Sequence, residues 1–365
     1  MHNNMSQYKP DCQEARDRMI AWWAGKKIDR VPAAVSAPLK PPNPRVASIC
    51  NEVPAKYTDP ETVLANMEYR LEHTFWGGEK FPTHHITFGP IFSLAYLGCE
   101  PHFMPHTTWY EPCLQDWSEL PNIKFDPNNR WRKLSLEMVR LSAERANGRW
   151  LVTRSGHIAS LTDLICGLLG NEKTMMAMAE HPEALKAALN RMMPWSCQAC
   201  DEAYENTRRY QEGCTDWMQS WWAPGHAVTA QCDMSVMISP EMFRDFVVPE
   251  LENIYNHVDY GIYHLDGPEQ IRHLDMMLQI DKLHLIQWVP GHRTSNPVHH
   301  ADPMNWLDLF RRIQESGKKV LISCPPSRVR PLLDKIARDR VLLSVNCEDE
   351  ATAQNVLQEL DRIGV

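Results

Sequence analysis

Four side chains with metal-ligating chemistry stand at the ends of short apolar runs in the last third of the sequence. His264 and Asp266 form an H-x-D pair, and Cys324 and Cys347 each end a later run. Residues two apart on a strand point to the same side, so the H-x-D pair would act together. Zinc takes imidazole, thiolate and carboxylate ligands, and three of them with one open position make a catalytic site. The pattern predicts a zinc centre.

An alternative interpretation needs no metal. Both cysteines would then be small buried core residues, and His264 and Asp266 would hydrogen-bond to each other. The long spacing between the H-x-D pair and the cysteines is not specific to a metal site by itself. The residues alone leave both interpretations open.

Tryptophans at the ends of apolar runs are candidates for a ligand pocket. The chain has 13 tryptophans, and we expect most of them in the core. Trp221, Trp222 and Trp288, together with Gln287, are predicted to line a pocket. Indole faces there would favour an apolar, aromatic or quaternary ammonium ligand.

The elements that must position these residues form a regular series. Eight short β-rich runs cover residues 30–36, 84–90, 150–156, 216–222, 260–267, 283–291, 319–326 and 340–347. Helical spacing follows many of them, which is typical of βα units, and runs such as VLIS and VLLSV suit strands covered on both faces. Eight units predict an α/β fold, a single (β/α)8 TIM barrel with its chemistry at the carboxyl ends of the strands.

Further segments decorate this barrel. Residues 1–29 are predicted to form a helical extension, and the Pro-rich, aromatic residues 91–129 are predicted to be an insertion after the second strand, over the barrel mouth. Leu185, Leu189 and Met192 mark a helix that we expect to be interrupted or kinked near Pro194. Other helices are expected over residues 268–279, 304–316, 329–338 and 350–363. We find no repeat or linker, so residues 1–365 are expected to be one domain.

Composition excludes several classes of protein. There are 38 Lys and Arg residues against 46 Asp and Glu residues, a net charge of -8, and no basic stripe that would bind nucleic acid. No run of apolar residues is long enough to predict a membrane span, and the start lacks a signal-peptide pattern. The 11 cysteines are odd in number and scattered, so we interpret them as thiols. We expect a cytoplasmic protein.

Several longer motifs resemble one known group of proteins. They are RDRMIAWWAGKKIDRVPA at residues 16–33, LTDLICGLLGNEKTMMAMAEHPEALKAAL at 161–189, DMSVMISPEMFRDFVVPEL at 233–251 and YHLDG at 263–267. Together they resemble the uroporphyrinogen decarboxylase superfamily, which includes the decarboxylase and the corrinoid-linked methyltransferases that act on thiols. The resemblance covers nearly the whole chain and implies the same (β/α)8 barrel.

The two branches of that superfamily differ in the residues they imply. The decarboxylase carries an M-R-Q-A-G-R-like segment after the first strand, whereas this chain has only Lys40 and Arg45 there. One lysine does not replace paired guanidinium groups that bind carboxylates. The methyltransferase branch binds zinc through H-x-C and a later cysteine, which His264 and Cys347 match. Asp266 stands at the place of the middle cysteine, with Cys324 as a possible substitute.

The leading prediction is therefore a methyltransferase that moves a methyl group between a corrinoid protein and a small acceptor with the help of zinc. Asp233 and His157 are the candidates for positioning the substrate or moving a proton. A carboxy-lyase is the alternative enzyme, in which Asp233, Asp266 and Gln287 would stabilise developing charge. A third alternative is a barrel that binds a ligand without catalysis. The superfamily also suggests a homodimer.

Overall fold

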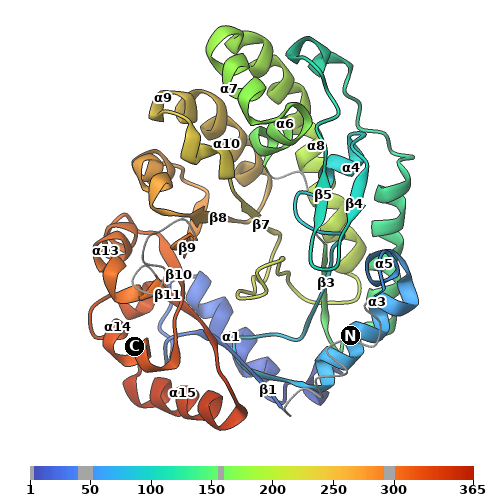
Figure 1. The fold of residues 1–365 in the computed structure, drawn as a ribbon. Helices are drawn as coiled ribbons and strands as arrows, with labels where there is room; N and C mark the ends of the chain where they lie inside the picture. The colour runs from blue at the N-terminus through green and yellow to red at the C-terminus, as the bar shows by residue number, and fades with distance from the viewer. Residues whose placement is uncertain (1–3, 40–51, 155–159, 292–300) are drawn as a thin grey trace.

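The computed structural model of the protein describes residues 4–39, 52–154, 160–291 and 301–365 (Figure 1). Its strands are β1 Ala33–Pro38, β2 Thr74–Gly78, β3 Thr83–Ile86, β4 Pro101–Phe103, β5 Thr108–Tyr110, β6 Leu151–Arg154, β7 Ala227–Ala230, β8 Tyr260–Asp266, β9 Leu283–Val289, β10 Lys319–Ser323 and β11 Val341–Asn346. Helices surround most of these strands. The architecture is mixed α/β, as expected.

The main sheet has seven strands in the order β2-β1-β11-β10-β9-β8-β7. All its neighbours pair in parallel except β2, which is antiparallel to β1. Strands β3 and β6 form a separate parallel pair. In Figure 1 the strands of the two sheets are arranged in a ring, and β3 lies on the side of this ring between β1 and β7. The order joins the first strand, β1, to the last, β11, and then follows the chain backwards to β7, but among the described residues the hydrogen-bonded sheet is not closed. A closed TIM barrel is therefore not confirmed.

Seven of the eight predicted strands are present, and the fourth is wrong. Residues 216–222 are rich in tryptophan, yet they form a loop in which Asp216 accepts the backbone N–H of Met218 at 2.9 Å. Such a side-chain bond to the backbone two residues on stabilises a turn. The strand at this place is β7, a run of only four residues that follows the loop.

The misassigned segment fills the middle of the ring (Figure 1). Trp221 and Trp222 are buried in a core cluster with Leu321 and Leu342 of β10 and β11. The hydroxyl groups of Ser220 and Ser344 also lie 3.1 Å apart. The tryptophans of this segment therefore reflect packing in the core rather than a strand.

The helices are α1 Cys12–Trp23, α2 Ala55–Thr58, α3 Pro60–Glu72, α4 Ser93–Tyr96, α5 Arg130–Ala146, α6 Leu161–Leu169, α7 Asn171–Glu180, α8 Pro182–Thr207, α9 Pro240–Met242, α10 Val248–His257, α11 Leu274–Leu278, α13 Leu307–Glu315, α14 Val329–Leu333 and α15 Glu350–Ile363. The predicted bounds of α15 are confirmed. The expected interruption near Pro194 is wrong, because α8 continues through that residue.

No helix of the described segments combines the length and apolar character needed to cross a membrane.

The N-terminal segment is helical, as predicted, and α1 closes one end of the ring. The indole N–H of Trp23 donates to the backbone carbonyl of Trp222 at 2.8 Å. Trp22 and Met19 belong to the same core cluster as Trp222. These contacts leave the other end, where the parallel strands finish, as the place for a site.

Residues 91–129 form a small layer of their own beside that end. They contain α4, the antiparallel pair of β4 and β5, and a short 3-10 helix, Trp117–Asn122. Asn129 caps the following helix α5 by accepting the backbone N–H groups of Trp131 and Arg132. The layer contributes several residues to the cavity described next.

Candidate functional site

A cavity of about 520 Å³ lies at the carboxyl ends of β3 and β7. Its wall includes the aromatic residues Tyr57, Phe92 and Trp217 and the carboxyl groups of Asp163 and Asp233. Ligand sites in α/β folds of this type are found at the carboxyl ends of parallel strands. This cavity, which we call the mouth cavity, is the candidate active site.

Asp233 is held in the mouth cavity by its neighbours. It directly follows the short loop after β7, and the side-chain amide of Gln231 donates to its Oδ2 at 3.0 Å. The surrounding protein desolvates the carboxyl group, and Asp163 and Asp266 add negative charge, so the pKa of Asp233 is raised to about 7. A carboxyl group with such a pKa can give and take protons near neutral pH. Asp233 is the predicted catalytic residue that the structure places best.

Asp163 supports Asp233 from the first turn of α6. Its two oxygens accept the backbone N–H groups of Asp233 and Met234, each at 2.9 Å, and the hydroxyl of Ser160 donates to Oδ2 at 2.7 Å. Asp163 is buried. The loop that carries Asp233 is thus bonded directly to helix α6.

His264 lies on the interior face of β8, next to the mouth cavity. Its Nδ1 is hydrogen-bonded to the side-chain amide oxygen of Gln287, the residue paired with it on β9. Trp217 meets the imidazole edge-on, with ring centroids 5.0 Å apart. Burial lowers the pKa of His264, while Gln287 and Asp266 oppose that effect, so the ring is neutral at pH 7. A neutral ring bonded through Nδ1 presents Nε2 as a hydrogen-bond acceptor.

Asp266, at the end of β8, lies in a second hollow of about 390 Å³ that also contains Asp233. Within the described structure, its Oδ1 is buried without a hydrogen-bond partner. Its charge contributes to the raised pKa of Asp233. His264 and Asp266 therefore lie on the same face of β8, and their joint role in a site stays a prediction.

Cys324 and Cys347 do not join this pair. Leu321 and Leu342 face the interior of the ring, and each thiol follows one of them by an odd number of residues. Strand alternation therefore places both thiols on the opposite face. Both belong to the core cluster that holds the apolar residues of the surrounding helices, because a small thiol one residue beyond a strand packs well under a helix.

The charged groups that act on the two thiols do not include His264 or Asp266. They are Asp302 and Arg328 for Cys324, and Asp349 and Glu348 for Cys347. Burial raises the pKa of both thiols. Among the residues with described positions, no three His, Cys, Asp or Glu side chains are grouped as ligands of one metal ion. The predicted set of four ligands is thus not assembled in this part of the chain.

The tryptophans and Gln287 divide among several places. Trp221 and Trp222 lie in the core rather than in the mouth cavity, which differs from their prediction as pocket residues and follows from the path of their loop. Trp288 faces a separate hollow of about 360 Å³, against Trp306 at 4.7 Å between ring centroids. Gln287 is hydrogen-bonded to His264, and His157 lies outside the described residues.

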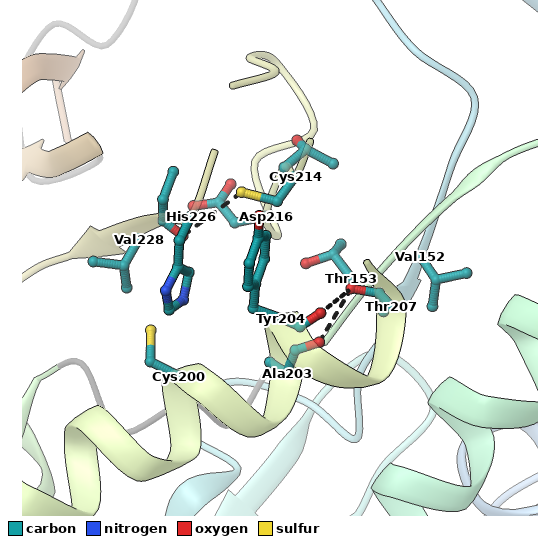
Figure 2. Close-up of a pocket in the computed structure, with 12 residues that line it drawn as sticks. Val152, Thr153, Cys200, Ala203, Tyr204, Thr207, Cys214, Asp216, His226 and Val228 are labelled. Atoms are coloured by element: carbon teal, nitrogen blue, oxygen red, sulfur yellow. Dashed lines mark hydrogen bonds between the residues drawn. The ribbon is translucent and has the colours of Figure 1, made fainter. Parts of the chain in front are cut away.

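A smaller cavity, of about 40 Å³, lies between α8 and β7 (Figure 2). Its wall includes Asp216, Cys214 and the stacked rings of Tyr204 and His226, whose centroids are 4.5 Å apart. Burial raises the pKa of Asp216 to about 7. The residue after Asp216 is Trp217, so this buried carboxyl group anchors the loop that forms one wall of the mouth cavity.

Sequence patterns alone do not identify three contributors to the mouth cavity. Trp217 belongs to the segment predicted as a strand, and its neighbours Trp221 and Trp222 have the same residue type with a different role. Asp163 stands in the LTDL motif at the start of a helix, which is the only signal for it. Tyr57 lies far from the other residues in sequence and reaches the cavity only through the fold.

Comparisons with known proteins show similarity in fold. No protein-family model and no curated protein sequence matches the chain. A solved structure described as a methyltransferase from Methanosarcina mazei is similar over 96% of this chain and 98% of its own, with a TM-score of 0.65. The sequence identity is 12%. At this identity the similarity concerns the fold.

Proposed function

We propose that the chain is a methyltransferase and that the mouth cavity is its active site. The observation that carries the proposal is Asp233, a carboxyl group with a pKa raised to about 7, in an aromatic-lined cavity at the strand ends. The resemblance of the sequence motifs to corrinoid-linked methyltransferases supports the reaction class. The similarity in fold to a methyltransferase from Methanosarcina mazei is consistent with it.

In the proposed reaction Asp233 acts as a general base. The carboxylate takes the proton of the acceptor group, and the acceptor atom attacks the methyl carbon with the electron pair left behind. The bond from that carbon to the methyl carrier breaks, and its electrons stay with the carrier. The rings of Trp217, Tyr57 and Phe92 exclude water from the acceptor. General base catalysis of this kind typically contributes about 100-fold or more to the rate.

The neutral imidazole of His264 can position the acceptor. Its Nδ1 is engaged by Gln287, so Nε2 remains as the acceptor of a hydrogen bond from the substrate. Trp217 fixes the ring from the other side by its edge-on contact. His264 would thereby orient the group that Asp233 deprotonates.

Zinc and a corrinoid protein remain predictions. Zinc would supply Lewis acidity to the acceptor, but the described residues do not fit the predicted four-ligand centre, since Cys324 and Cys347 face away from His264 and Asp266. We therefore assign no step to zinc. A corrinoid protein would be the methyl carrier, and a homodimer is the expected assembly, which the mass in solution would test.

A carboxy-lyase is the second candidate, because a protonated Asp233 could also protonate the carbanion that decarboxylation leaves. The carboxyl groups of Asp163 and Asp233 count against a substrate with many carboxylates, since like charges repel in a desolvated cavity. Turnover of such a substrate without a methyl carrier would favour this candidate over methyl transfer.

The test is an assay of methyl transfer from methylcobalamin to small thiols, alcohols and amines. The absorption spectrum of the cobalamin reports the transfer. We expect transfer by the wild type and a loss of about 100-fold for Asp233→Asn, which keeps the shape of the side chain but cannot act as a base. Asp233→Glu should retain part of the rate, and the exposed Asp308→Asn should retain all of it. A wild-type rate for Asp233→Asn would overturn the assigned role.

An inactive protein would have a different meaning. Ligand binding without transfer, both with methylcobalamin and with a corrinoid protein as the carrier, would favour the non-catalytic barrel. It would overturn the proposed methyltransferase activity.

A further inference from the structure

We propose that the mouth cavity selects an organic cation, namely a methylated ammonium group, as its small-molecule ligand. This inference rests on the proposed function in taking the mouth cavity as the active site. It goes beyond that function because it names the charge and the shape of the ligand. Carboxyl groups and aromatic rings on the same cavity wall carry the argument.

The wall of the mouth cavity carries negative charge. Asp163 and Asp233 both line the mouth cavity, and Asp266 adds negative charge from the adjoining hollow. Within the described part of the chain, neither Asp163 nor Asp233 forms an ion pair with a lysine or an arginine. Their hydrogen bonds come from neutral donors, which are backbone N–H groups, Ser160 and Gln231. A cation would offset charge that these neutral donors leave uncompensated.

Aromatic rings form another part of the cavity wall. Trp217, Tyr57 and Phe92 come from three separate segments and line the same cavity. The face of an aromatic ring attracts a cation within about 6 Å of its centroid, and tryptophan is the strongest of the three types. Methylated ammonium groups suit such walls because their charge is spread over an apolar surface. A compact, strongly hydrated ammonium ion would gain less.

The same wall disfavours anionic and neutral ligands. A carboxylate, sulfonate or phosphate group would face Asp163 and Asp233 across a partly desolvated space, where like charges cost more than they do in water. A neutral ligand of the same shape would fill the apolar wall but leave the carboxylates unpaired. The cavity should therefore rank cation above neutral isostere, and neutral isostere above anion.

The experiment measures the binding of three probes of similar size by calorimetry. They are choline, its neutral isostere 3,3-dimethylbutan-1-ol, and 3,3-dimethylbutanoate, the carboxylate with the same carbon skeleton as the isostere. We expect choline to bind at least about tenfold more tightly than the neutral isostere, and the carboxylate to bind most weakly. Equal binding of choline and the neutral isostere, or tighter binding of the carboxylate, would overturn the inference.

Variants locate the binding to this cavity. Asp233→Asn should remove most of the preference for choline over the neutral isostere, whereas Trp217→Leu should weaken choline more than Trp217→Phe does. The matched control is Trp109→Phe, because Trp109 is 62% exposed and lies outside the cavity wall. Unchanged preference in both cavity variants would overturn the placement.

The outcome also separates this inference from the proposed function. Tight choline binding in a protein that transfers no methyl group would sustain the cation site and count against the methyltransferase. Methyl transfer to or from neutral substrates, without preferential choline binding, would sustain the methyltransferase and overturn the cation site.

Discussion

The carboxylate of Asp163 accepts the backbone N–H of Asp233 at 2.9 Å, so the first turn of α6 fixes the position of the candidate base. The second oxygen of Asp163 accepts the N–H of Met234 at the same distance. Two residues 70 positions apart in sequence thus form one unit, in which Asp163 is the positioning residue. Its charge also contributes to the raised pKa of Asp233.

Replacement of Asp163 should affect both stability and the titration of Asp233. Asp163→Ala leaves two N–H groups without an acceptor, so we expect the free energy of unfolding to fall by on the order of 3 kcal/mol. Asp163→Asn keeps one acceptor oxygen and should cost less. Urea unfolding measures both effects, and Asp308→Ala on the surface is the control. Loss of the negative charge in Asp163→Asn should also lower the pKa of Asp233, and an unchanged pKa would contradict the coupling.

Trp217 and Trp222 lie five residues apart in sequence. Substitution of Trp222 should mainly reduce stability, whereas substitution of Trp217 should mainly reduce ligand binding. Trp222 is 2% exposed in the core, so Trp222→Ala should lower the free energy of unfolding by about 3–5 kcal/mol. Trp217 is half-buried at the cavity wall, so Trp217→Ala should cost less stability and more ligand binding. Thermal unfolding and choline calorimetry measure the two effects. A larger loss of stability in Trp217→Ala would contradict the assigned positions.

The sequence predicts the strands of the last third well for a physical reason. Strands β8 to β11 are covered on both faces, and apolar runs such as VLLSV in β11 suit that environment. Residues 216–222 have a similar apolar content but are buried inside the ring as a loop. The apolar content of a segment predicts that it is buried, but it does not distinguish a buried strand from a buried loop.

The candidate site is less predictable because it depends on which face a residue occupies at a strand end. His264 and Asp266 lie within β8, where alternation fixes their direction. Cys324 and Cys347 lie one residue beyond their strands, and a single step in register turns each thiol toward the helices. Asp163 and Tyr57 enter the cavity through contacts between distant segments, which no local pattern encodes.

Asp216 should make stability depend on pH. Burial raises its pKa to about 7 in the folded protein, whereas an unfolded aspartate has a pKa of about 3.9. Between about pH 4 and pH 7 the folded state therefore binds more protons, and stability falls as pH rises. Each pKa unit corresponds to about 1.4 kcal/mol, so the total effect is on the order of 4 kcal/mol.

The variant Asp216→Asn isolates this effect, because the amide keeps the shape of the side chain and does not titrate. The stability of the wild type relative to Asp216→Asn should decline from pH 4 to pH 7 and stay constant above that range. Urea unfolding at a series of pH values measures the difference. A difference that does not change with pH would show that Asp216 is ionised throughout.

The zinc content of variants tests whether His264 and Asp266 bind a metal ion without Cys324 and Cys347. Because Cys324 and Cys347 pack on the helix side of the sheet, we expect Cys324→Ala and Cys347→Ala to bind as much zinc as the wild type. Both variants should lose about 1 kcal/mol of stability from the missing sulfur. Elemental analysis of protein purified without chelator measures the zinc, with His264→Ala as the comparison. Loss of zinc in Cys347→Ala would contradict the outward placement of its thiol, and a wild type without zinc would exclude the predicted metal centre.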